Sequence, residues 1–205
     1  MTDSQLSHVH RHRPATVPGR APLLLLHGTG GDENDLLPLG EALSDGAALL
    51  SPRGPVLENG MPRFFRRLAE GVFDEADVCR RAEELADFVS AARESYGLAA
   101  PIAVGFSNGA NIAAAILLLR PRVLAGAVLL RAMVPLNAAP AADLAGKPVL
   151  LLSGAADPIV PTRNAAQLAS MLAGAGAAVD HQVLPVGHGL SQADIAKARA
   201  WLDRT

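Results

Sequence analysis

The feature that most constrains the fold is the five-residue stretch Gly105-Phe-Ser-Asn-Gly109. Residues 100–104 before it are apolar and partly β-branched, which predicts a buried strand. Residues 110–120 after it are rich in alanine and leucine, which predicts a helix. A serine in the turn between such a strand and such a helix matches a nucleophile elbow, where strained backbone exposes the hydroxyl above a sheet. The same pattern also fits an ordinary strand–turn–helix unit with a capping serine, so the rest of the chain must decide between the two.

Strands and helices are expected to alternate along the whole chain. Strands are expected at residues 22–26, 47–50, 100–104, 123–130, 148–153 and 179–184, and helices at 33–44, 74–96, 110–120, 161–172 and 191–203. This order predicts an α/β fold, with one mostly parallel sheet and helices on both of its faces. Residues 21–205 are expected to form a single domain, preceded by a polar N-terminal arm or edge strand at residues 1–20.

The composition excludes several classes of protein. The net charge is −2 with both signs mixed along the chain, so no basic face indicates a nucleic-acid partner. The longest apolar runs, residues 23–26 and 112–119, are too short to span a bilayer, and the polar N-terminus lacks the apolar core of a signal peptide. We therefore expect a cytoplasmic protein that does not insert into a membrane. The single cysteine, Cys79, is expected to be a small core residue rather than a reactive thiol.

Three histidines alternate with other residues near the N-terminus, at His8, His10 and His12. A period of two places them on one face of any strand formed there. Imidazole is a common metal ligand, so a metal site is one interpretation. A polar edge strand or loose arm is favoured, because no carboxylate or further histidine nearby completes a site. No metal is therefore expected.

Candidate functional residues follow four of the expected strands: Ser107, Asp157, His188 and the loop at residues 27–31. In a parallel sheet, ligands bind at the carboxyl ends of the strands, so these residues should share one rim. His188 could take the proton of Ser107, and Asp157 could orient the imidazole and stabilise its charged form. Asp157 could instead form a turn and His188 could be a solvated loop residue. The order serine, aspartate, histidine and the placement after strands favour a catalytic triad.

An oxyanion that develops during acyl transfer needs two backbone donors. One is expected to be the N–H of Asn108, which follows the nucleophile at the helix start. The other is expected from the loop at residues 27–31, with Thr29 preferred over Gly30. His27 is interpreted as a residue that shapes this loop rather than as a second base.

Residues 52–73 form the only long connection expected, and long connections in compact domains are often lids or binding loops. Phe64 or Phe65 could supply an apolar wall for the substrate. An arginine of the same run could face an acidic substrate group, because the planar guanidinium suits a carboxylate. The arginines concerned are Arg63, Arg66 and Arg67, and Gly30 is a further candidate for substrate contact. The other interpretation is that these arginines are solvated or hold the loop through ion pairs.

Only residues 131–147 separate the expected strands at residues 123–130 and 148–153. This connection is too short to hold a cap domain over the site. We therefore expect no cap domain and a fairly open site.

Together these segments resemble the carboxylesterase/phospholipase branch of the α/β-hydrolases, which includes acyl-protein thioesterases and lysophospholipases. Within that branch the chain is most similar to small bacterial hydrolases associated with quinone and hydroquinone stress. The matching segments are residues 23–37, 58–71, 105–111, 157–158 and 187–188. The resemblance implies a metal-independent serine hydrolase without a cofactor, with Ser107 as nucleophile, Asp157 as acid and His188 as base. It also suggests a homodimer.

The favoured function is a carboxylesterase that hydrolyses small to medium esters through an acyl-enzyme. A thioesterase or lysophospholipase with the same triad is the alternative, although the Arg-Phe-Phe-Arg-Arg run departs from the thioesterase pattern. A non-catalytic ligand-binding protein could also use this fold, but the presence of all three triad residues argues against it.

Overall fold

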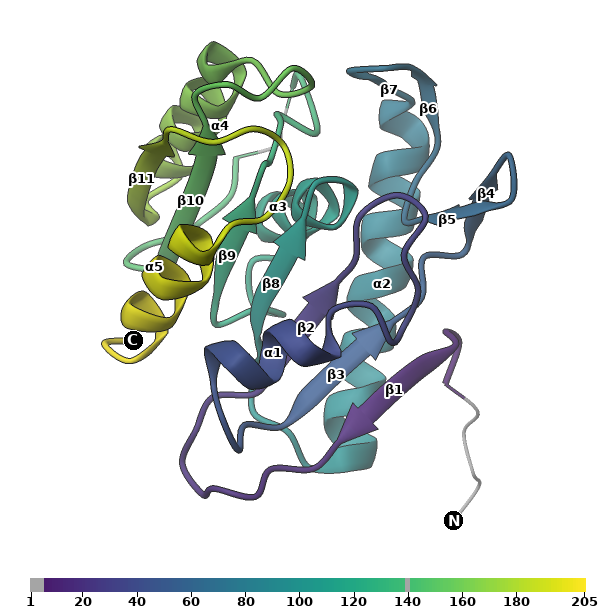
Figure 1. The fold of residues 1–205 in the computed structure, drawn as a ribbon. Coiled ribbons are helices and arrows are strands. Elements are labelled where there is room, and N and C mark those ends of the chain that lie inside the picture. The colour runs from purple at the N-terminus through teal and green to yellow at the C-terminus, as the bar shows by residue number, and fades with distance from the viewer. Residues whose placement is uncertain (1–5, 139–140) are drawn as a thin grey trace.

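The computed structural model describes residues 6–138 and 141–205, which are built around a seven-stranded sheet (Figure 1). The strand order is β1-β3-β2-β8-β9-β10-β11. The strands are β1 (His10–Arg13), β2 (Leu23–Leu26), β3 (Leu49–Pro52), β8 (Ile102–Phe106), β9 (Gly126–Leu130), β10 (Pro148–Gly154) and β11 (Ala178–Leu184). All neighbouring pairs are parallel except β1 and β3, which are antiparallel. The predicted, mostly parallel sheet is thus confirmed.

Helices cover both faces of this sheet, as predicted (Figure 1). One face carries α1 (Leu37–Leu43) and α5 (Gln192–Leu202), and the other carries α2 (Glu75–Tyr96), α3 (Asn108–Leu119) and α4 (Thr162–Gly174). Strand β2 shows why an all-apolar strand suits this arrangement. Leu24 and Leu26 enter the core beneath α2 and α3, while Leu23 and Leu25 enter the core beneath α1 and α5. Both faces of the strand are buried, so alternation with polar residues is lost.

Local signals explain where the helices begin and end. Asp74 caps α2 by accepting a hydrogen bond from the Asp77 N–H, and Gly97 ends the helix with φ of 65°. The helix expected from residue 33 begins only at Leu37. The Asp32 carboxylate accepts the Asn34 N–H at 2.7 Å, which favours a turn over a first helical turn there.

The described part of the N-terminal segment contains β1, an edge strand, and residues 1–5 of the expected arm lie outside the described residues. His10 Nε2 lies 2.7 Å from the Tyr96 hydroxyl, and His12 stacks on the Tyr96 ring with centroids 3.9 Å apart. His8 packs against Phe88. The three histidines therefore share one face, as the period of two predicts, and that face packs on α2.

The connection at residues 52–73 is more regular than the sequence suggested. It forms two hairpins, β4 (Val56–Glu58) with β5 (Met61–Arg63) and β6 (Arg67–Ala69) with β7 (Val72–Phe73). Asn59 and Gly60 have φ of 52° and 79°, which suits the tight turn between β4 and β5. Figure 1 shows both hairpins beside the edge at which the parallel strands end.

Three further expectations concern a cap domain, a membrane-spanning helix and the reactivity of Cys79. The described residues between β9 and β10 form neither helix nor strand, so no cap domain occupies this connection there. Within residues 6–138 and 141–205, no helix combines the length and apolarity needed to cross a bilayer. Cys79 is partly buried on α2, and burial raises the pKa of its thiol, which disfavours the reactive thiolate.

Candidate active site

Ser107 lies at the junction of β8 and α3 with φ of 51° and ψ of −113°, a backbone conformation that residues other than glycine rarely adopt. The strand and helix approach closely at this point. A Cβ atom at Gly109 would lie 1.9 Å from the Leu26 carbonyl oxygen, and one at Gly105 would lie 2.5 Å from the Gly109 carbonyl oxygen. The Ser107 N–H donates to the Leu130 carbonyl at 2.8 Å. Both glycines are therefore needed for the geometry of the elbow.

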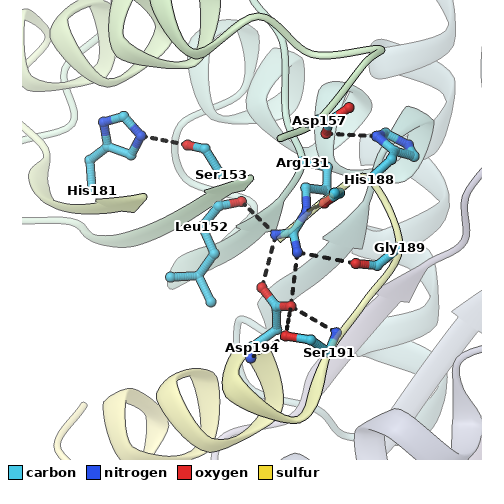
Figure 2. Close-up of polar contacts among 10 residues, drawn as sticks. Arg131, Leu152, Ser153, Asp157, His181, His188, Gly189, Ser191 and Asp194 are labelled. Atoms are coloured by element: carbon cyan, nitrogen blue, oxygen red, sulfur yellow. Dashed lines mark hydrogen bonds and ion pairs between the residues drawn. The ribbon is translucent and has the colours of Figure 1, made fainter. Parts of the chain in front are cut away.

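The three residues expected to form a triad come together at the carboxyl ends of β8, β10 and β11. His188 Nε2 lies 3.1 Å from Ser107 Oγ, and His188 Nδ1 lies 2.8 Å from Asp157 Oδ2. The second of these contacts is drawn in Figure 2. The Phe106 ring packs against the imidazole of His188, with centroids 5.4 Å apart. One imidazole thus joins a hydroxyl to a carboxylate, the arrangement that activates a serine.

Asp157 is held in its ionised form. Burial alone would raise the pKa of its carboxyl group, but hydrogen bonds from the Val160 N–H, from His188 and from the Ile159 N–H outweigh burial and lower the pKa. Because Oδ1 accepts both backbone N–H groups, Oδ2 is left for the imidazole. The turn that Asp157 forms and its contact with His188 therefore occur together, although the sequence presented them as alternatives.

Two of the three candidate oxyanion donors remain suitable. The Asn108 N–H belongs to the first turn of α3, where N–H groups have no partner within the helix. The Gly30 N–H is already used, because it donates to the Pro62 carbonyl at 3.0 Å. Thr29 lines the same cavity as Ser107. Gly30 does not line it, so the expectation that Gly30 contacts substrate is wrong.

His27 is a buried residue that shapes the loop. Its Nε2 accepts the Gly54 N–H at 2.9 Å, so Nδ1 carries the proton and donates to the Gly28 carbonyl at 2.7 Å. Burial lowers the pKa of His27, which favours this neutral form. With both nitrogens occupied, His27 has none left to act as a base.

A cavity of about 250 Å³ opens beside Ser107. Its apolar wall consists of Phe73, Phe106, Met133, Ile159 and Val160. Phe64 and Phe65, expected to supply this wall, do not line the cavity and are almost completely buried in the core. Their position has a physical cause, since the Phe64 N–H donates to Asn108 Oδ1 at 2.8 Å and so holds the backbone against the start of α3.

The arginines of the same run separate into two groups. Arg63 and Arg67 line the cavity, and both contact Glu58, through Nε at 3.2 Å and 2.8 Å respectively. Arg63 also donates through Nη1 to Thr29 Oγ1 at 2.6 Å. The expectation that Arg66 faces the substrate is wrong, because this side chain is 65 % exposed, pairs with Asp74 and lies outside the cavity lining.

Arg131 was not recognised as a site residue from the sequence, although it lines the cavity and is completely buried. Its guanidinium pairs with Asp194 through two hydrogen bonds of 2.8 Å (Figure 2). The only available signal was its place directly after a strand that ends at the rim. Nothing in the sequence indicated Asp194 as its partner, because 62 residues lie between them.

Several known proteins are similar to this chain in sequence and in fold. The Phospholipase/Carboxylesterase family matches residues 13–205. The protein MhqD of Bacillus subtilis (strain 168) is 48% identical over 181 residues, which cover 87% of this chain and 90% of MhqD. The crystal structure of the Bacillus cereus carboxylesterase superposes with a TM-score of 0.95 at 44% identity, covering 98% of this chain and 96% of that one. The structure of YahD with malic acid superposes with a TM-score of 0.91 at 30% identity, covering 97% and 99%.

Proposed function

Because the chain belongs to the phospholipase/carboxylesterase family of α/β-hydrolases and is a serine hydrolase, we propose that it hydrolyses small to medium carboxylic esters through Ser107, His188 and Asp157. One observation carries this proposal. The His188 ring lies between Ser107 Oγ at 3.1 Å and Asp157 Oδ2 at 2.8 Å. Both distances lie within hydrogen-bond reach, as general-base activation of a serine requires.

The reaction would proceed in two stages. Ser107 Oγ attacks the ester carbonyl carbon while His188 Nε2 takes its proton, and the carbonyl π electrons move onto the oxygen to give a tetrahedral oxyanion. Collapse of this intermediate breaks the bond to the alcohol oxygen, which receives the proton from His188. An acyl-enzyme remains on Ser107. Water then gives a proton to His188 and attacks the acyl carbon, and collapse returns the proton to Ser107 and releases the acid.

Asp157 would act through His188 and would not take a proton itself. Its lowered pKa keeps the carboxylate charged, so it stabilises the imidazolium that forms in each transition state and keeps the acceptor nitrogen directed at Ser107.

The oxyanion would bind to the backbone N–H groups of Thr29 and Asn108. The Asn108 N–H lies at the start of α3, where the helix dipole also favours negative charge. A single oxyanion donor typically contributes about 10²- to 10³-fold to kcat.

The cavity supports a small ester that carries an acidic group. Its volume of about 250 Å³ lies below the usual range for drug-sized ligands, which favours small substituents next to the scissile bond. Arg67 bonds Glu58 through Nε, and no bond from its Nη nitrogens to another described residue is present. These nitrogens would bind a substrate carboxylate. The malic acid in the YahD structure is a small carboxylic acid of the expected kind. Thioesters and lysophospholipids are the alternative substrates for the same triad.

A substrate panel tests the proposal. It consists of p-nitrophenyl esters of increasing acyl length, one thioester and one lysophospholipid, with the Ser107→Ala variant as control. We expect the highest kcat/KM for short acyl esters, and loss of all turnover in Ser107→Ala. Full ester turnover by folded Ser107→Ala would disprove the role of Ser107. A higher kcat/KM for the thioester or the lysophospholipid would replace the proposed substrate class.

A further inference from the structure

Arg131 holds the backbone on both sides of His188. Its Nε donates to the Gly187 carbonyl at 2.9 Å, and its Nη2 donates to the Gly189 carbonyl at 3.2 Å. Its Nη1 donates to the Leu152 carbonyl at 3.2 Å, and the remaining bonds reach Asp194 (Figure 2). The buried guanidinium of Arg131 thus donates hydrogen bonds to the loop that carries His188, to the adjacent strand β10 and to one carboxylate.

Asp194 fixes the direction of this guanidinium. It is 1 % exposed, and each of its oxygens accepts one hydrogen bond of 2.8 Å from Arg131. Its Oδ2 also accepts the Ser191 N–H at 2.8 Å and the Ser191 hydroxyl at 2.7 Å, as part of the capping box that begins α5. Burial alone would raise the pKa of Asp194, but the hydrogen bonds from Arg131 and Ser191 outweigh burial and lower it. The Arg131–Asp194 ion pair therefore holds Gly187 and Gly189, which flank His188, and also Ser191, which follows them.

The same part of β9 also holds the nucleophile. The Leu130 carbonyl accepts the Ser107 N–H at 2.8 Å, and the next residue is Arg131, whose φ is 58°. Two consecutive residues therefore fix the backbone of the elbow and the backbone of the loop that carries the base. Without such contacts, a Gly-His-Gly segment has great backbone freedom, because glycine is conformationally permissive.

We propose that Arg131 is a positioning residue for ester hydrolysis, which keeps His188 Nε2 within hydrogen-bond reach of Ser107 by binding the Gly187 and Gly189 carbonyls. Asp194 serves to orient Arg131. This inference rests on the proposed role of the triad. Stability alone is a weak reason for such a pair, since hydrophobic residues of similar volume often replace a buried ion pair without loss.

The test compares Arg131→Lys with Ser153→Ala. Lysine keeps the positive charge beside Asp194, but its single nitrogen cannot reproduce the planar fork that binds three carbonyls and a carboxylate. Ser153 is a matched control on β10, because it is 1 % exposed and its hydroxyl bonds only His181 among the described residues, at 2.6 Å from the hydroxyl oxygen to Nε2 (Figure 2). Both variants lose buried polar contacts, but only Arg131→Lys loses contacts to the loop of His188.

The readouts are Tm, kcat, KM and the rate of labelling by a fluorophosphonate, measured well below the melting temperature. For Arg131→Lys we expect kcat and the labelling rate to fall together by about 10- to 100-fold, the cost of misplacing a catalytic group by about 1 Å, while KM changes less than about threefold. For Ser153→Ala we expect a lower Tm with unchanged kcat.

Three results separate the possible failures. An Arg131→Lys variant with a lowered Tm but unchanged kcat and labelling rate would overturn the positioning role and leave the triad intact. Unchanged activity in Ser107→Ala would instead overturn the proposed function. If Arg131→Lys does not fold, Asp194→Asn gives the same test. Asparagine keeps the size of the side chain but replaces one of the two acceptor oxygens beside Arg131 with an amide NH2 that cannot accept, which weakens the orientation of Arg131. The value of kcat must then fall with KM nearly constant, and an unchanged kcat overturns the proposal.

Discussion

The two walls of the cavity are built in different ways. One wall carries Ser107 and His188, with Asp157 buried behind His188, and these three residues follow strands of the parallel sheet. The other wall belongs to the two hairpins at residues 56–73, which are outside that sheet. Side-chain acceptors of the main fold hold it in place: His27 accepts the Gly54 N–H, Asn108 accepts the Phe64 N–H, and Asp77 accepts the Arg66 N–H.

Because the two walls are held differently, one fold can keep the same catalytic chemistry while its substrate varies. The strand-end wall is continuous with the backbone ladder and the core, so the distances among its polar groups are fixed. The hairpin wall is anchored by the buried rings of Phe64 and Phe65 and by a few hydrogen bonds, but it leaves Leu57 and Leu68 about 70 % exposed. We therefore expect changes in the strand-end wall to abolish turnover, and changes in the hairpin wall to alter stability or selectivity.

The largest expected effect is that of Asp157→Asn. The asparagine amide would no longer stabilise the imidazolium or keep the correct tautomer of His188, so kcat should fall by about 10⁴-fold. Ester turnover by the purified variant measures this, with Asp180→Asn on β11 as the control. A fall of less than tenfold would show that the contact of Asp157 with His188 does not matter for catalysis.

The pH dependence of kcat/KM gives the next largest effect. The pKa of Asp157 lies below its ordinary value of 3.8, so this carboxylate stays charged between about pH 5 and 8. A single titrating group other than Asp157 should then account for the acid limb, where kcat/KM should decrease about tenfold per pH unit. A decrease of about a hundredfold per unit would mean that a second group titrates with it, which would contradict the assignment of Asp157.

Asn108→Ala tests how the hairpin wall is attached. The variant keeps the backbone N–H for the oxyanion but leaves the buried Phe64 N–H without its acceptor, at a cost of about 1–3 kcal/mol. Urea denaturation should show this loss of unfolding free energy, with kcat reduced less than tenfold. Unchanged stability would show that the Asn108 side chain does not hold this wall.

The smallest effect is expected from the arginines of the hairpin wall. Arg67→Gln should lower kcat/KM for an ester that carries a carboxylate by about two- to fivefold, relative to a neutral ester of the same size. This factor corresponds to the free energy of a partly exposed ion pair. Arg66→Gln is the matched control, because Arg66 lies outside the cavity lining, and should leave this ratio unchanged. Equal losses for both esters in Arg67→Gln would remove the acidic-group preference.

The positions of residues in the strand-end wall could be predicted from the sequence, whereas those in the hairpin wall could not. Apolar runs fixed the strands well enough to place Ser107, Asp157 and His188 at one rim, because the carboxyl ends of parallel strands always meet there. The directions of Phe64 and Arg66 depend on distant acceptors, Asn108 and Asp77, that no local pattern reveals. The pairing of Arg131 with Asp194 was likewise hidden, since only the folded chain brings β9 and α5 together.

The most direct test of the account is the covalent labelling of Ser107. The purified protein and the His188→Ala variant are treated with a fluorophosphonate, and the modified peptide is identified by mass spectrometry. If the proposed triad is correct, we expect a single adduct on Ser107, formed at least a hundredfold more slowly when His188 is replaced. An adduct on another residue, or equal labelling rates in the two folded proteins, would contradict it.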